Sequence, residues 1–239
     1  MDRLTAPVFT SFDEAWSWFA AGGELVSEAD KRAAWTRGRA QFLAFAAPVT
    51  DAAVIDHARD LQDEMANVDG LRFVPDEQFH ISIRGVGFQV IEKRRDDDVL
   101  RQDVPRIAAR ATPIVVATRQ IAIAVGPLNV FPDAVVLEVR DDGSLADLRS
   151  RLGALSGPDA FGLGDAVYLP HLTIATFASA GLAGELRNRL PPLRGRAPVA
   201  SSIRRIEFVR AWFTGIDESE ETEIDVVHSY PLKARPSSP

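Results

Sequence analysis

The feature of this sequence that most restricts its fold is a five-residue pattern that occurs twice. Residues 79–83 read Phe-His-Ile-Ser-Ile, and residues 170–174 read Pro-His-Leu-Thr-Ile. Both lie in apolar runs with the β-branched residues typical of strands, where side chains alternate between the two faces. In each run a histidine and a hydroxyl therefore share one face, while aliphatic side chains point to a core on the other. We predict that the two runs are the two halves of one active site.

The pattern belongs to a longer internal repeat. In segments 42–88 and 135–177, a strand leads to a helix, then to a loop, and then to the strand that carries the histidine. A repeated strand–helix–strand unit predicts a duplicated module. We therefore expect an α+β fold with two pseudo-symmetric lobes, in which antiparallel sheets line a central cleft and helices lie outside.

The remaining segments divide the chain further. Residues 1–40 predict a helical extension with caps at Ser11 and Ser27, because Ser favours the first position before a helix. Residues 41–233 form the expected bilobal domain, and residues 234–239 form an expected flexible tail. Within the domain the patterns predict helices at 51–67, 96–111, 144–155 and 180–190, a Pro-rich turn after the last of these, and strands at 114–117, 120–125, 134–139, 203–215 and 222–232.

Composition limits the function classes. The chain has 239 residues, 46% of them apolar, and its net charge is −7, so it can form a sizeable core and is not attracted to polyanions in general. No extended nucleic-acid footprint and no membrane partner are expected, while a small phosphorylated substrate stays possible. The chain has no cysteine, which excludes thiol nucleophiles and Cys-ligated zinc. It lacks a secretory leader and an apolar stretch of membrane-spanning length, so we expect a cytoplasmic monomer.

The paired His-Ile-Ser-Ile and His-Leu-Thr-Ile in a duplicated layout resemble the two-histidine (2H) phosphoesterase superfamily, which includes proteins labelled 2′-5′ RNA ligases and cyclic nucleotide phosphodiesterases of RNA processing. The resemblance covers about residues 40–232 and leaves the first 40 residues unexplained. It implies that His80 and His171 are catalytic and that Ser82 and Thr173 bind phosphate. The implied activity is metal-independent hydrolysis of a cyclic phosphodiester, the 2′,3′-cyclic phosphate of a nucleotide or RNA end, without a cofactor.

Histidine suits this chemistry. Water must lose a proton on one side of the phosphorus while the leaving oxygen gains one on the other, and an imidazole titrates near neutrality. The sequence leaves open which histidine is the base; we favour His171 as base and His80 as acid. Of the other two histidines, His57 is expected at the surface and His228 in a structural role.

Two further residues are candidates for the site. By strand alternation Arg84 shares the face of His80 and would bring positive charge to the phosphate, although it equally fits an exposed strand end. Some relatives instead carry a basic residue shortly after the second motif, where this chain has residues 175–177, Ala-Thr-Phe. Tyr168 precedes the second motif and is expected to pack in the core, or else to line the substrate pocket.

Two other function classes remain open. One is a 2′-5′ RNA ligase or an RNA-end-binding module with little turnover, which the acidic charge disfavours. The other is a metallohydrolase with His80 and His171 as ligands beside carboxylates. The sequence has no His-x-x-x-His or comparable ligand cluster to support it.

Overall fold

The computed structural model describes residues 7–156, 159–161, 168–213 and 223–234, so residues 235–239 of the expected tail lie outside it. Its helices are α1 Phe12–Ala20, α2 Glu28–Thr36, α3 Ala52–Met65, α4 Val104–Val116, α5 Ser144–Gly153 and α6 Ala183–Arg194. Its strands are β1 Gln41–Pro48, β2 Leu71–Phe73, β3 His80–Val90, β4 Asp98–Leu100, β5 Ile121–Phe131, β6 Ala134–Arg140, β7 His171–Phe177, β8 Val199–Ile203, β9 Arg205–Trp212 and β10 Glu223–Pro231. Within these residues, no helix has the length and apolar character needed to cross a membrane.

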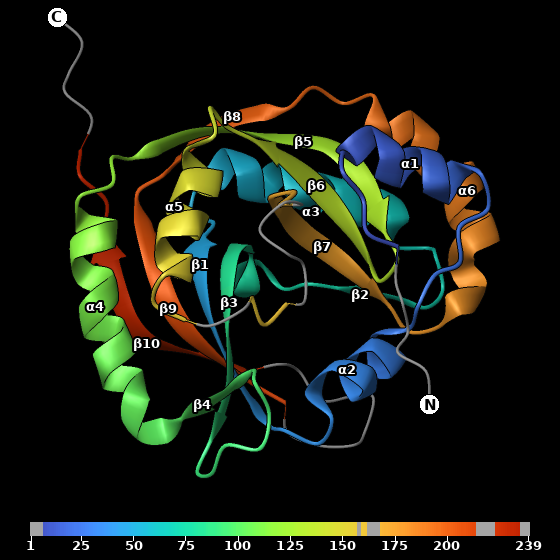
Figure 1. The fold of residues 1–239 in the computed structure, drawn as a ribbon. Coiled ribbons are helices and arrows are strands. Elements are labelled where there is room, and N and C mark those ends of the chain that lie inside the picture. Colours follow the sequence, from blue (N-terminus) through green and yellow to red (C-terminus); the bar gives the residue numbers. More distant parts are fainter. Residues whose placement is uncertain (1–6, 157–158, 162–167, 214–222, 235–239) are drawn as a thin grey trace, which may run out of the picture.

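The strands of the described residues form one curled sheet in the order β10-β9-β1-β3-β7-β6-β5-β8, with β2 beside β7 and β4 beside β3. Its halves meet at β3 and β7. Helices α4 and α5 contact β10 and β3 of the first half, while α3 and α6 contact β8, β7 and β5 of the second (Figure 1). The helix that follows β1 thus packs on the second half, and the helix that follows β6 packs on the first. The α+β fold class that the repeat predicts is confirmed, while the exchange of helices between the halves was not predicted.

Strand alternation places β1 between two apolar clusters. Leu43, Phe45 and Ala47 belong to the main core, whereas the alternate residues Phe42, Ala44 and Ala46 belong to a second cluster with Phe88 and Val209. Because neighbouring residues on a strand point to opposite faces, both faces of β1 are covered. The main core packs under the helices just described, and the second cluster covers part of the opposite face of the sheet.

Helices α1 and α2 precede β1 and form what we call the N-terminal arm, residues 9–39. Ser11 and Ser27 cap these helices as expected, each accepting a backbone N–H through its side-chain oxygen at 3.1 Å. The arm lies on the second apolar cluster through Trp35, whose ring centroid is 4.4 Å from that of Phe42 and 5.2 Å from that of Phe88.

The structure corrects two element assignments, both at prolines. Residues 114–117 were expected as a strand, but helix α4 continues to Val116 with Pro113 inside it. The same helix was expected to begin at residue 96 and begins at Val104. A Pro-rich turn was expected after residue 190, yet α6 runs to Arg194. In both cases apolar residues at helical spacing are buried on either side of the proline, and this packing outweighs the local preference for a break. The buried positions are 104, 107, 111 and 115 in α4 and 186, 190 and 193 in α6.

Candidate active site

The two histidine motifs lie on adjacent antiparallel strands at the centre of the sheet. Ile81 of β3 pairs with Leu172 of β7, so the register sets His80 opposite Thr173 and Ser82 opposite His171. Side chains at directly opposed positions share a face, with Cα atoms about 4.5–5.5 Å apart. The structure thus brings the four motif residues together in two crossed pairs, each a histidine beside the hydroxyl of the other motif.

The two sides of these strands differ in character. Ile81 and Leu172 are 1% and 0% exposed and belong to the main core. The four motif residues on the other side, His80, Ser82, His171 and Thr173, all stay partly exposed. A reactant can therefore reach them from the side away from the core.

Each histidine ring is oriented by a main-chain carbonyl two residues earlier. The Nδ1 atom of His80 lies 2.7 Å from the oxygen of Gln78, and Nδ1 of His171 lies 2.8 Å from the oxygen of Leu169. Because a carbonyl oxygen only accepts hydrogen bonds, Nδ1 carries the proton in both rings. In the neutral tautomer, Nε2 is then the nitrogen that can take a proton.

Burial governs the ionisation of both rings. It lowers the pKa of His80, while the hydrogen bond to Gln78 and the carboxylate of Glu207 act in the opposite direction. Burial also lowers the pKa of His171. The hydrogen bond to the Leu169 carbonyl and the negative charge of Asp133 raise this pKa, whereas the positive charges of Lys31 and of His80 lower it further. Both free imidazoles are therefore mainly neutral at pH 7.

Two neighbours of His171 were not foreseen. Glu138 of β6 is opposite His171 in register and fully buried; its side chain accepts from Asn129 at 2.9 Å and from Arg140 at 2.7 Å, and it pairs with Arg194 at 2.9 Å. A glutamate within the apolar run 134–139 is the sequence signal that could have revealed it. The ring of Phe131 meets that of His171 edge-on, with centroids 4.8 Å apart.

The structure places Arg84 away from the histidines. The pairing of β1 with β3 shifts between Ser82 and Arg84, and such a bulge interrupts the alternation on which the prediction relied. Arg84 is 3% exposed, opposite the core residue Phe45, and its guanidinium lies against Gly153 of α5. The expectation that it shares the face of His80 is therefore wrong.

Tyr168 packs between β3 and α5. Its hydroxyl donates a hydrogen bond to the Ser82 carbonyl at 2.9 Å, and the Arg149 guanidinium lies over its ring at 4.7 Å from the centroid. Burial raises its pKa above the usual range. Tyr168 therefore packs against the main core, as expected, and lies next to the main chain of Ser82.

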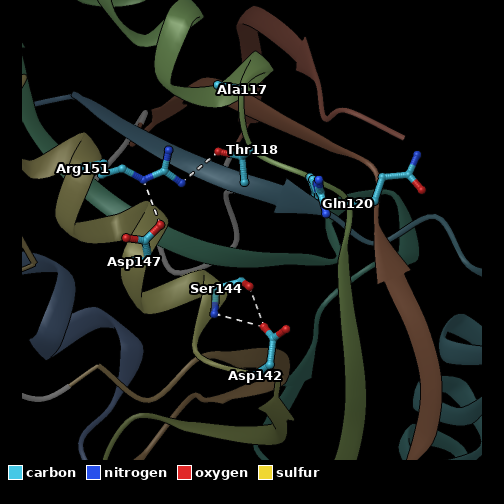
Figure 2. A pocket seen from close by; sticks show the side chains of 8 residues that line it. Ala117, Thr118, Gln120, Asp142, Ser144, Asp147 and Arg151 are labelled. Atoms are coloured by element: carbon cyan, nitrogen blue, oxygen red, sulfur yellow. Dashed lines mark hydrogen bonds and ion pairs between the residues drawn. The ribbon is translucent and has the colours of Figure 1, made fainter. Parts of the chain in front are cut away.

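A hollow of about 720 Å³ lies elsewhere, where α4 leads into β5 and β6 leads into α5 (Figure 2). Its polar side chains bond to one another: Arg151 donates to Thr118 and Asp147, and Ser144 donates to Asp142. None of the four motif residues lines it. The histidines and hydroxyls of the candidate site lie instead at the β3–β7 junction.

A model of the 2′-5′ RNA ligase superfamily matches residues 46–211, well over half of the chain. The chain belongs to the 2′-5′ RNA ligase superfamily. This membership confirms the resemblance to the 2H phosphoesterases that the two motifs indicated. The match begins after the N-terminal arm, so the arm lies outside the part that the superfamily model describes.

Solved structures share the superfamily fold at low identity. TT0787 of Thermus thermophilus is 15% identical, with a TM-score of 0.57, over 82% of this chain and 100% of that chain. LigT of E. coli in its apo form is 13% identical, with a TM-score of 0.57, over 82% and 99%. LigT complexed with 3′-AMP is 11% identical, with a TM-score of 0.55, over 82% and 99%. Among curated protein sequences none matches this chain.

Proposed function

We propose that this member of the superfamily hydrolyses a cyclic phosphodiester, the 2′,3′-cyclic phosphate of a nucleotide or RNA end, with its two histidines as general acid and base and without a metal or cofactor. The observation that carries the proposal is the register of β3 and β7, which sets each histidine beside the hydroxyl of the other motif. The 2H phosphoesterase membership supports a phosphoryl-transfer role in general.

In the proposed reaction, a water oxygen attacks phosphorus and the bond from phosphorus to one ribose oxygen breaks. The neutral imidazole takes a proton from the water at Nε2, and the protonated imidazole gives its Nε2 proton to the departing ribose oxygen. Water is thereby added across one P–O bond. The two rings end with their protonation states exchanged, and proton transfer with solvent restores them.

We assign His171 as the base and His80 as the acid. Glu207 stabilises the protonated form of His80. At His171, the positive charge of Lys31 opposes the effect of Asp133. The charges around the two rings therefore favour a proton on His80, and they support the assignment that the sequence left open.

The hydroxyls of Ser82 and Thr173 would donate hydrogen bonds to the non-bridging phosphate oxygens, whose negative charge grows in the transition state. Each hydroxyl is opposite the histidine of the other motif, so a phosphate between the rings has a donor on either side. Arg84 takes no part in this assignment, because it lies on the other face of the strand.

A small substrate fits the composition. The net charge of −7 disfavours long polyanions, and LigT, which shares the fold, has been crystallised with 3′-AMP, a ribose that carries a phosphate. We therefore propose a nucleotide or the terminal nucleotide of an RNA as the partner of the site, with no extended contact to nucleic acid and a monomeric chain in the cytoplasm.

The test is hydrolysis of 2′,3′-cyclic AMP in the presence of EDTA, followed by separation of the nucleotide products. The wild-type chain should open the ring. His80→Ala and His171→Ala should each lose most of the turnover, about a hundredfold or more, and the double variant should lose little beyond that, because the pair acts as a unit. His228→Ala is the matched control and should retain full activity. Loss of wild-type activity on chelation, or strictly additive losses, would contradict the proposal.

The family description favours RNA-end joining as a second candidate. Incubation of an RNA bearing a 2′,3′-cyclic phosphate with an RNA bearing a 5′-hydroxyl decides between the two. Joined product in place of hydrolysis would identify a ligase. Retention of the RNA without conversion, weakened strongly by salt, would identify an end-binding module.

A further inference from the structure

The N-terminal arm connects both halves of the sheet around the motif residues. On the first half, the Trp35 indole packs on β1 and β3 and donates to the Ala160 carbonyl at 3.2 Å. On the second half, the Val26 N–H donates to the Pro132 carbonyl at 2.7 Å, in the turn between β5 and β6. The rings of Phe9 and Phe12 stack on Phe131. Figure 1 shows the arm as two blue helices, α1 beside α6 and α2 near the end of β7.

Helix α2 reaches the strand face that carries the second motif. Thr173 and Thr176 of β7 are partly exposed, while the two residues between them are buried. A bulge in the pairing with β6 accounts for this spacing and returns Thr176 to the face of Thr173. The Thr176 hydroxyl donates to the Glu28 carboxylate at 2.6 Å, so the first turn of α2 lies against β7 three residues beyond Thr173.

Lys31 follows Glu28 by three positions and therefore lies on the same side of α2. Its ammonium pairs with Asp133 in the β5–β6 turn, and its side chain stays 54% exposed. Asp133 lies two residues after Phe131, whose ring contacts His171. Lys31 thus stands at the edge of the site next to the second histidine, held by one carboxylate and open to solvent.

Neither of the two motif strands, β3 and β7, offers the phosphate a cation. On β7 no lysine or arginine occurs from His171 to Phe177, and Arg84 on β3 lies against α5. An ammonium offers three donors on a flexible stem, so it can reach an anion while one donor stays with Asp133.

We infer that Lys31, supplied by the N-terminal arm, binds the phosphate of the substrate and takes the place of a basic residue on the motif strands. This inference deepens the proposed function and rests on the same site. It also gives the arm a role in the reaction, because the segment outside the superfamily model would carry the cation on which phosphate affinity depends.

Calorimetric titration with inorganic phosphate tests the inference independently of turnover. Lys31→Met should weaken phosphate binding about tenfold, since a hydrogen bond to a charged group is lost. Lys31→Arg should restore most of the affinity. Lys93→Met, at an exposed position beyond β3, is the matched control and should bind like the wild type. The exposed Lys31–Asp133 pair contributes little to folding, so a melting curve should show all variants folded.

The outcomes separate this inference from the proposed function. Equal phosphate affinity in Lys31→Met and Lys93→Met would overturn the inference, even if the wild type opens the cyclic phosphate. Absence of phosphate binding by the wild type would overturn it as well. Phosphate binding that depends on Lys31, in a chain that does not hydrolyse 2′,3′-cyclic AMP, would support the inference and reject the hydrolase.

Discussion

At the scale of single residues, the two histidines are prepared by the main chain. In both motifs Nδ1 bonds to the carbonyl two residues earlier, so the tautomer does not depend on a neighbouring side chain. The environment of the rings, by contrast, comes from residues distant in sequence: Glu207 acts on His80, and Asp133 and Lys31 act on His171. The motif thus determines which nitrogen is available, while the fold determines how readily it takes a proton.

Glu138, the register partner of His171, should be important for stability. It is fully buried and holds Arg140 and Arg194 through its two oxygens. Glu138→Gln removes the charge and leaves Arg194, whose side chain is 18% exposed, without its buried counter-charge. Loss of one partner of a buried pair costs about 3 kcal/mol, and we expect a decrease of that size in the free energy of unfolding, measured in urea.

The matched control for Glu138 is Glu64→Gln. Glu64 also pairs with an arginine, Arg196, but its side chain is 47% exposed. Exposed pairs contribute little, so this variant should unfold at nearly the wild-type urea concentration. Equal effects of the two substitutions would show that the buried position of Glu138 is not what matters.

At the scale of elements, the N-terminal arm should stabilise the sheet as well as the site. Trp35→Ala removes a ring that lies among Phe42, Phe88, Phe161 and Phe213. Truncation of a large packed aromatic typically costs about 3–5 kcal/mol, and this ring is partly exposed, so we expect a loss of about 3 kcal/mol in urea unfolding. Ile91→Ala, at a side chain that is 90% exposed, should change stability little. A similar small effect of both variants would mean that the arm is only loosely attached.

The elements also show how far sequence reasoning reaches. The histidine strands and the capped helices of the arm were predictable, because alternation and capping are local patterns. The helix through Pro113 and the bulge before Arg84 were not, because each depends on contacts with elements distant in sequence. For the same reason the sequence indicated the pair His80 and His171 but not Lys31, whose position depends on the path of the arm.

At the scale of the whole molecule, the curled sheet converts a sequence repeat into a shared site. The repeat alone does not show that its two histidines lie close together. The antiparallel pairing of β3 with β7, in the register Ile81–Leu172, brings the two motifs side by side. A slip of one residue would turn one motif toward the core. Burial of Ile81, Ile83, Leu172 and Ile174 therefore protects the geometry of the site as well as the fold.

The shared site should also determine the pH dependence of the reaction. In the proposed mechanism, turnover needs one neutral and one protonated ring, and this state is most populated between the two apparent pKa values of the pair. Because burial lowers the pKa of both His80 and His171, both values lie below the usual one of about 6.5. For the wild type, kcat/KM with 2′,3′-cyclic AMP should therefore follow a bell with its maximum on the acidic side of that value. It should fall as rising pH removes the proton of the acid.

The variant Glu207→Gln tests which limb of the pH profile reports the titration of each histidine. The carboxylate raises the pKa of His80, so its removal should lower that pKa further. If His80 is the acid, the alkaline limb of the bell moves to lower pH while the acidic limb stays in place. Movement of the acidic limb alone would reverse the assignment and make His80 the base. A wild-type maximum well above the usual histidine pKa would contradict the burial argument itself, because the reacting pair would then titrate as solvent-exposed rings do.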